Sequence, residues 1–206
     1  MKNIKTILLF ITLLASSALF AGLAIPGEGN PMLASSKIEI NNTDGYTVEK
    51  LSDNEGVRIK VRTPEGKDFW ISEVLGDHEK KFMFNGESSN LLVADINADA
   101  KPEIITAVAF PPHNGALYIF TLNAEQNGFT PIAFNNQQTK DAKSFLTADI
   151  FQEDGQDLAF IDNRVRALGM HYPENEEAEP VASFFYYKLT GNTFAYDSCE
   201  AVPVEN

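Results

Sequence analysis

The sequence predicts an all-β domain, and three observations support this prediction. From Lys37 onward the chain is made of short segments, either alternating or wholly apolar, that are rich in β-branched and aromatic residues. Gly, Pro, Asn and Asp, which favour turns, separate these segments. No long stretch of the sequence keeps the 3.6-residue period of an amphipathic helix. We therefore expect antiparallel strands joined by turns.

The expected strands follow one another along the whole domain. In chain order the segments are "YTVEKL", "GVRIKVRT", "DFWISEVL", "KKFMF", "LLVAD", "EIITAVAF", "ALYIFTL", "FTPIAF", "FLTADI", "DLAFID", "RVRALGM", "ASFFYYKL" and "FAYDS". Their core must be held by burial rather than by an internal disulfide, because Cys199 is the only cysteine. For this thiol we expect burial, and an intermolecular disulfide is the alternative.

The first residues have the pattern of a secretory signal peptide. Lys2 and Lys5 precede a short apolar run, which small residues follow. We expect residues 1–21 to be a cleaved signal peptide. An uncleaved anchor is the weaker alternative, because the apolar run is short for a membrane span. The mature chain is then extracytoplasmic, either periplasmic or secreted, without stable membrane insertion.

After the leader, residues 22–36 are rich in Gly, Pro and Ser without a period, which indicates a flexible lead-in. Residues 37–206 are expected to form a single β-repeat domain.

The net charge narrows the choice of partners. The chain has a formal charge of −13, which loss of Lys2 and Lys5 with the leader would make more negative. Such a surface repels phosphate backbones, so nucleic acid is not an expected partner. A protein or glycan partner is expected, and among proteins a basic one is favoured by long-range attraction.

Two parts of the sequence resemble each other. The segment "LLVADINADAKPEIITAV" aligns without gaps on "FLTADIFQEDGQDLAFID", which sets Asp95 against Asp149. Each copy reads as a strand, an acidic loop and further strands, and the acidic insert Pro173–Pro180 lengthens the second copy. Repetition of this kind is typical of propeller blades and stacked arrays. We expect repeat units of about 38–86, 90–136 and 144–198, the first incomplete.

The best candidate site is the acidic loop, Asp95–Glu103. Side-chain oxygens occur at its positions 1, 3, 5 and 9, and a backbone carbonyl at position 7 can add a further ligand, as calcium prefers. The predicted ligands are Asp95, Asn97, Asp99, Lys101 through its carbonyl, and Glu103. A helix-flanked calcium hand fits poorly, because its twelfth position would be Thr106 and the flanks are strands.

A strand-flanked loop of this type resembles the FG-GAP/VCBS repeats of integrin α-chain propellers and many bacterial extracellular proteins. The resemblance covers about residues 90–198 and implies a propeller-like fold of antiparallel four-stranded units with calcium in the loops. An open β-stack or sandwich is the alternative, because the domain is short for a closed ring. Ala100 stands where the family has Gly, at a turn that favours positive φ.

The second loop, Asp149–Asp157, is a weaker calcium candidate. Its expected ligands are Asp149, Glu153 and Asp157, but Phe151 replaces the oxygen at the third position. Both loops have the alternative of being turns whose Asp side chains cap backbone amides.

A further candidate is the proline loop, which joins two predicted strands and consists of Pro111, Pro112, His113 and Asn114. Its two prolines stiffen a polar tip, so binding a partner would cost little ordering entropy. A rigid hairpin loop without a partner is the alternative.

These features favour a non-enzymatic binding module, which is expected to recognise a protein or a glycan. A basic cell-wall hydrolase that the module inhibits is the partner we expect first, since some bacterial periplasmic propellers that resemble this chain inhibit lysozyme-like enzymes. An extracellular hydrolase of wall polymer, or a structural envelope or adhesion protein, is the alternative. The three histidines show no zinc-ligand spacing, and the chain has no phosphate loop or nucleophile elbow.

Overall fold

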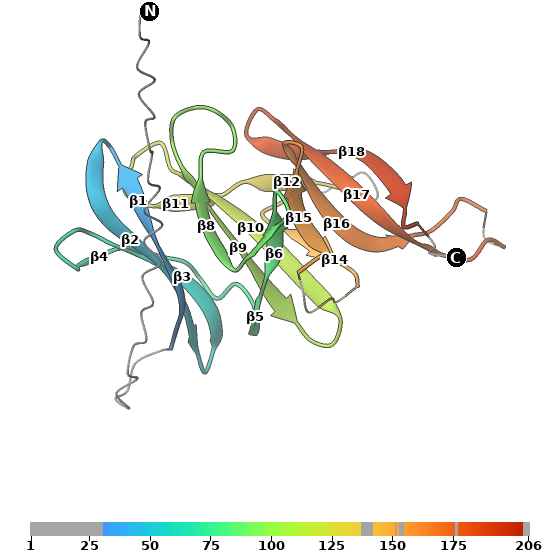
Figure 1. Ribbon diagram of the computed structural model, residues 1–206, viewed down its shortest axis with the longest axis horizontal. Coiled ribbons are helices and arrows are strands. Elements are labelled where there is room, and N and C mark those ends of the chain that lie inside the picture. The colour runs from blue at the N-terminus through green and yellow to red at the C-terminus, as the bar shows by residue number, and fades with distance from the viewer. Residues whose placement is uncertain (1–30, 137–141, 151, 153–154, 176, 204–206) are drawn as a thin grey trace, which may run out of the picture.

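The computed structural model describes residues 31–136, 142–150, 152, 155–175 and 177–203. The predicted signal peptide lies outside this part of the chain. The described residues form β-strands and no helix, in three sheets that follow one another along the long axis (Figure 1). Accordingly, none of the described segments is a helix that could cross a membrane. The all-β class predicted from the sequence is confirmed.

Sheet A is an antiparallel meander at the N-terminal end of the domain. Its strands, in spatial and chain order, are β1 (Met32–Ile40), β2 (Thr43–Asp53), β3 (Gly56–Arg62) and β4 (Asp68–Ile71). The strand β1 begins within the segment predicted to be a flexible lead-in, because residues 32–36 pair with β2.

Sheet B lies in the middle of the molecule and is built around the antiparallel pair β9 and β10. Its strands are β5 (His78–Lys80), β8 (Leu91–Ala94), β9 (Glu103–Phe110), β10 (Asn114–Leu122), β11 (Phe129–Pro131) and β14 (Leu146–Ala148). Both β5 and β8 pair with β9, while β11 and β14 pair with β10.

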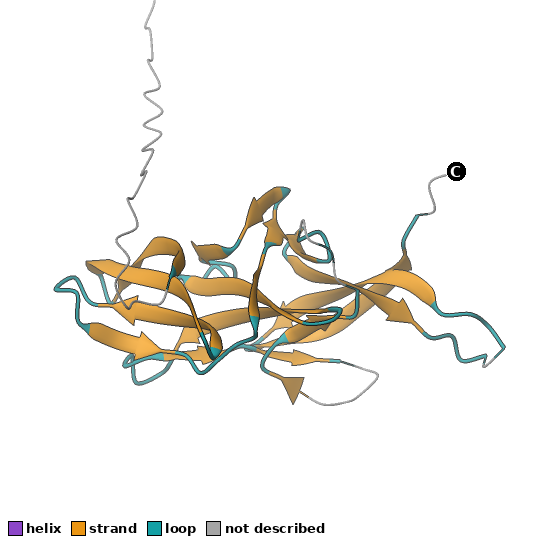
Figure 2. Cartoon of the chain, turned by 90° about the horizontal axis from the view of Figure 1, so that it is seen from below, coloured by secondary structure: helices purple, strands orange, loops and turns teal. Residues whose placement is uncertain are grey.

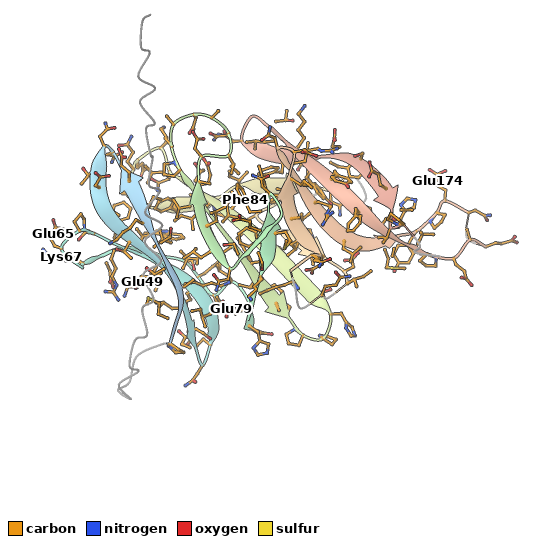
Figure 3. The ribbon with its side chains drawn as sticks, viewed as in Figure 1. Glu49, Glu65, Lys67, Glu79, Phe84 and Glu174 are labelled. Atoms are coloured by element: carbon orange, nitrogen blue, oxygen red, sulfur yellow. The ribbon has the colours of Figure 1, made fainter. Side chains whose placement is uncertain are left out.

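Sheet C is the C-terminal sheet. In spatial order it contains β13 (Ala142–Lys143), β12 (Ala133–Asn135), β18 (Thr193–Ala201), β17 (Val181–Thr190), β16 (Arg164–His171), β15 (Leu158–Ile161), β6 (Phe82–Phe84) and β7 (Glu87–Ser89). Two of its pairings, β12 with β18 and β15 with β6, are parallel, and the others are antiparallel. The long pair β16 and β17 carries the acidic insert at its end, where Glu174 lies far from the other sheets (Figure 3).

Sheet B is buried on both of its faces. Along β9, Ile104 and Val108 pack in the cluster shared with sheet A, whereas Ile105 and Ala107 pack in the cluster shared with sheet C. The strand β10 divides its side chains in the same way. Because alternate residues of a strand point to opposite faces, a strand covered on both sides needs an almost continuous apolar run. The burial of both faces explains why the segments "EIITAVAF" and "ALYIFTL" are almost wholly apolar. Figure 2 shows the sheets from a second side.

The two aligned segments of the sequence are paired differently. The acidic loop closes a hairpin within sheet B, because β8 pairs with β9. The second loop instead leads from β14, which pairs with β10, to β15, which pairs with β16 and β6. Further along the sequence, "LYIFTLNAEQNGFTPIAF" resembles "FFYYKLTGNTFAYDS", so β10 corresponds to β17. The strands β9 and β10 are direct neighbours, whereas β16 stands between β15 and β17. The three sheets do not close into a ring in the described part of the chain.

A buried lysine joins sheets A and B. Lys50 projects from β2 and is fully buried, and its ammonium donates to the backbone carbonyls of Lys80 at 3.2 Å, Asn90 at 3.0 Å and Ala107 at 2.7 Å. Burial lowers the pKa of Lys50 to about 8, and the negative charge of Glu79 opposes this shift. One ammonium therefore satisfies carbonyls from three segments of the neighbouring layer.

We predict that Lys50→Met lowers the free energy of unfolding by about 2–4 kcal/mol, because a similar apolar volume is kept while three carbonyls lose a charged donor. Urea denaturation of the mature chain measures the change. Lys37→Met on β1 is the matched control, since the Lys37 ammonium is exposed and donates only to Thr47 Oγ1 at 2.8 Å. Equal effects of the two substitutions would contradict the prediction.

Candidate functional site

The acidic loop is organised by its own backbone amides. The Asp95 carboxylate accepts hydrogen bonds from the amides of Asp99 at 3.3 Å and Ala100 at 2.9 Å, and Asn97 Oδ1 accepts from the amide of Asp99 at 2.9 Å. The Asp99 carboxylate in turn accepts from the amide of Lys101 at 2.8 Å. Asp95, Asn97 and Asp99 are exposed. The predicted alternative, in which Asp side chains cap backbone amides, therefore describes the geometry of this loop.

Glu103, the last predicted ligand, differs from the others because it is completely buried. Its carboxylate accepts from the amide of Ile96 at 3.1 Å and from Asn97 Nδ2 at 3.2 Å. Burial, together with the negative charges of Asp99 and Asp95, raises the pKa of Glu103 to about 7. The loop thus contains a buried carboxylate for which a nearby cation would be favourable.

The loop supplies oxygen donors of the kind that calcium prefers, two carboxylates and an amide at its exposed side and Glu103 beneath them. Ala100 has a φ of 64°, as expected for this turn, and Ala98, for which no such expectation arose from the sequence, has a φ of 61°. In the described residues, however, no three His, Cys, Asp or Glu side chains are gathered closely enough to hold a metal ion. A metal would require the side chains to turn from the loop amides toward a common centre.

The second loop already has a cation from the protein itself. Lys80 Nζ lies 3.0 Å from Asp157 Oδ1 and donates to the carbonyl of Gln152 at 2.7 Å. The side chains of Lys80 and Asp157 are both buried, and a Cβ added at Gly115 would overlap the Lys80 side chain. The predicted ligand Glu153 lies outside the described residues. Lys80 thus neutralises the carboxylate that the sequence assigns to a second calcium loop.

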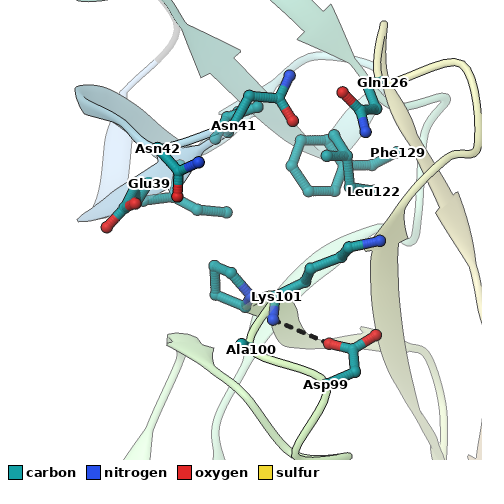
Figure 4. A pocket seen from close by; sticks show the side chains of 12 residues that line it. Glu39, Asn41, Asn42, Asp99, Ala100, Lys101, Leu122, Gln126 and Phe129 are labelled. Carbon is teal, nitrogen blue, oxygen red and sulfur yellow. Dashed lines mark hydrogen bonds between the residues drawn. The ribbon is translucent and has the colours of Figure 1, made fainter.

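A hollow of about 500 Å³ lies beside the acidic loop, between sheets A and B (Figure 4). Three turns surround it: the β1–β2 turn, the loop residues that follow Asp99, and the β10–β11 turn. Its lining residues are Ile38, Glu39, Ile40, Asn41, Asn42, Asp99, Ala100, Lys101, Pro102, Leu122, Gln126 and Phe129. We call it the amide hollow, because three of these residues are Asn or Gln. In Figure 4, Asn41 and Gln126 lie across the opening from Asp99.

The proline loop lies far from the acidic loop. The acidic loop ends where β9 begins, at Glu103, and the proline loop starts where β9 ends, at Phe110. Eight residues of strand span roughly 26 Å. Pro111, Pro112 and His113 are exposed. The two predicted binding elements therefore lie at opposite ends of β9.

Sequence reasoning missed the two buried lysines and the amide hollow. Lys50 could have been found, because alternation along β2 puts it on the same face as the buried Val48. Lys80 carries no such signal, since β5 is only three residues long. The hollow also has no local signal, because Asn41 and Gln126 are brought together by the packing of sheet A on sheet B.

Comparison of the chain with protein-family models, with curated proteins and with solved structures found no match. What the chain binds is therefore inferred from its own loops and hollows.

We predict that, without calcium, the free energy of unfolding contains a contribution from Glu103 that decreases as the pH rises. The unfolded carboxyl ionises near pH 4.5 and the folded one only near pH 7, so the unfolded state is favoured progressively between these values. Glu103→Gln cannot ionise. The difference in stability between this variant and the wild type should therefore shift in favour of the variant between about pH 5 and about pH 7.5.

Urea denaturation in the presence of a chelator measures this difference. Glu65→Gln, which removes an exposed carboxylate from the β3–β4 turn, controls for the loss of a charge alone. A difference between Glu103→Gln and the wild type that is independent of pH would show that Glu103 is not held by the buried environment described here.

Proposed function

We propose that the chain is an extracytoplasmic, non-enzymatic binding module, and that its partner is a basic protein. The observation that carries this proposal is that the proline loop is exposed while the two strands that it joins are buried. The loop is exposed and joins β9 to β10, whose residues are almost all buried in the middle layer of the molecule. A recognition loop held by the most deeply buried strand pair loses little freedom when it binds.

Charge supports a basic partner. The formal charge of −13 attracts a cationic protein over long distances and accelerates encounter at low salt. Lys80 and Asp157, which lie beneath the hairpin that carries the loop, neutralise each other. The attraction therefore comes from the acidic surface as a whole, and His113 and Asn114 would supply local polar contacts.

Within this class, we put first a cationic cell-wall hydrolase that the module inhibits. The proline loop has a narrow, stiffened tip that could enter a substrate cleft, and the acidic surface complements a cationic enzyme. A protein or glycan ligand without inhibition is the broader form of the same proposal.

The proposed architecture is a propeller-like or stacked arrangement of FG-GAP/VCBS-type units. Three meanders support it, because β1 to β4, β8 to β11 and β15 to β18 each form four consecutive antiparallel strands. We also propose that the acidic loop binds calcium through Asp95, Asn97, Asp99, the Lys101 carbonyl and Glu103. Calcium would supply positive charge beside the buried Glu103.

An extracellular hydrolase is the rival function. The carboxylate with the most suitable pKa for acid catalysis is Glu103, but its side chain is fully buried and bonded to Ile96 and Asn97. Glu103 does not line the amide hollow. In this arrangement its raised pKa is explained by burial within the loop, which favours the binding module over the hydrolase.

We predict that calcium raises the melting temperature of the mature chain, with a dissociation constant in the range of about 10⁻⁴–10⁻³ M that is typical of extracellular modules. At about ten times this constant the expected increase is roughly 3–6 °C. Asp95→Ala combined with Asp99→Ala should abolish the increase. The charge-matched control, Glu65→Ala combined with Glu73→Ala, removes two exposed carboxylates elsewhere and should retain it. An unchanged melting temperature in millimolar calcium would leave the loop as a turn.

We predict that the mature chain inhibits at least one cationic muramidase at stoichiometric concentration and that high salt weakens the inhibition. His113→Ala combined with Asn114→Ala should raise the inhibition constant by roughly ten- to a hundredfold. The control is His171→Ala combined with Asn192→Ala, which changes the same residue types at other exposed positions. Full activity of every enzyme in a panel of cationic wall hydrolases would overturn the inhibitor proposal.

A further inference from the structure

We propose that the amide hollow binds a short, neutral oligosaccharide, through the amides of Asn41, Asn42 and Gln126 above an apolar floor. This site lies between sheets A and B beside the acidic loop, at the opposite edge from the proline loop. The inference does not depend on the proposed protein partner. Its volume of about 500 Å³ is within the range of roughly 300–1,000 Å³ that is usual for small-molecule sites.

The polar groups of the hollow suit hydroxyl groups. Each amide offers two N–H donors and a carbonyl acceptor, so it can bond a hydroxyl in either direction. Among the described residues, the side chains of Asn41, Asn42 and Gln126 make no hydrogen bond, and all three residues are exposed. Their donors and acceptors are therefore available to a ligand.

The floor of the hollow is apolar. Ile38 and Phe129 are almost completely buried beneath it, and Leu122 and Pro102 are partly buried at its side. A sugar ring presents C–H groups on its faces and hydroxyls at its edge. Such a ring can therefore cover the apolar floor while its edge meets the amides, which is the usual division of labour in small-molecule sites.

The charges of the hollow disfavour an anionic ligand. Glu39 and Asp99 are carboxylates, and Lys101 is the single cation among the lining residues. An anion would meet two carboxylates for one ammonium, and a purely apolar ligand would leave the amides without partners. A neutral, hydroxyl-rich molecule uses donors and acceptors of every kind present and requires no unpaired charge.

The turns around the hollow hold four of its lining residues at positive φ. Asn41 has a φ of 54°, Asn42 of 56°, Gln126 of 56° and Ala100 of 64°. Asn41 and Asn42 form the two-residue turn between β1 and β2, in which both residues require positive φ. Tight turns fix their backbone, which reduces the entropy lost when a ligand is bound.

The test is titration of the isotope-labelled mature chain with three neutral trisaccharides, N-acetylchitotriose, cellotriose and maltotriose, followed by amide chemical shifts. We expect at least one of them, at millimolar concentration, to shift the amides of Asn41, Asn42 and Gln126. Asn41→Gly combined with Gln126→Gly removes two side chains but keeps positive φ accessible. It should weaken the binding by about tenfold or more.

The matched control is Asn85→Gly combined with Asn163→Gly. Both residues also have positive φ, 48° and 58°, and they lie in turns away from the hollow. This control should bind the trisaccharide as the wild type does. Equal weakening by both pairs of substitutions, or no loss of affinity in either, would place the binding elsewhere and overturn the proposal.

Two further titrations distinguish other ligands. If trilysine or inorganic phosphate shifts the hollow while all three trisaccharides leave it unchanged, the saccharide proposal is overturned in favour of a charged ligand. The variant with His113→Ala and Asn114→Ala should keep its trisaccharide binding. Failure of muramidase inhibition with intact trisaccharide binding would remove the proposed protein partner alone, and the reverse result would remove the saccharide site alone.

Discussion

The constraint on which the rest of the structure depends is the burial of sheet B on both faces. With sheet A packed on one side of β9 and β10 and sheet C on the other, most side chains along these strands fill a core. Polar chemistry can then occur only where the strands end. The acidic loop at one end of β9 and the proline loop at the other are direct results. The two candidate binding loops therefore lie at opposite ends of β9, on either side of an apolar layer.

Three packed layers also create a difficulty, because the ends of short edge strands leave backbone groups inside the interfaces. Lys50 solves it between sheets A and B by donating to three carbonyls, and Lys80 solves it between sheets B and C by bonding Asp157 and the Gln152 carbonyl. A long, flexible side chain with several donors can reach groups that no strand partner reaches. For Lys50 these bonds offset only part of the loss of solvation, because burial still lowers its pKa to about 8.

The sequence was informative where the signal is local. Alternation and turn residues predicted the strands, and the continuous apolar runs of β9 and β10 marked strands without an exposed face. The oxygen spacing in Asp95–Glu103 located the acidic loop, but not the burial of Glu103. The internal similarity could not show that the second loop joins strands of different sheets. The amide hollow was inaccessible for the same reason, since Asn41 and Gln126 meet only when two sheets pack.

The buried ammonium groups of Lys50 and Lys80 join the sheets without a metal ion. Both sheet interfaces are bridged by cations that are covalently part of the chain and cannot be removed by a chelator. The layers can therefore stay joined in a medium that strips metal ions. A metal at the acidic loop would occupy the rim of the molecule, outside these bridges, and could exchange without loosening them. The occupancy of such an ion would follow the ion concentration around the protein, and the ion would not be needed to hold the sheets together.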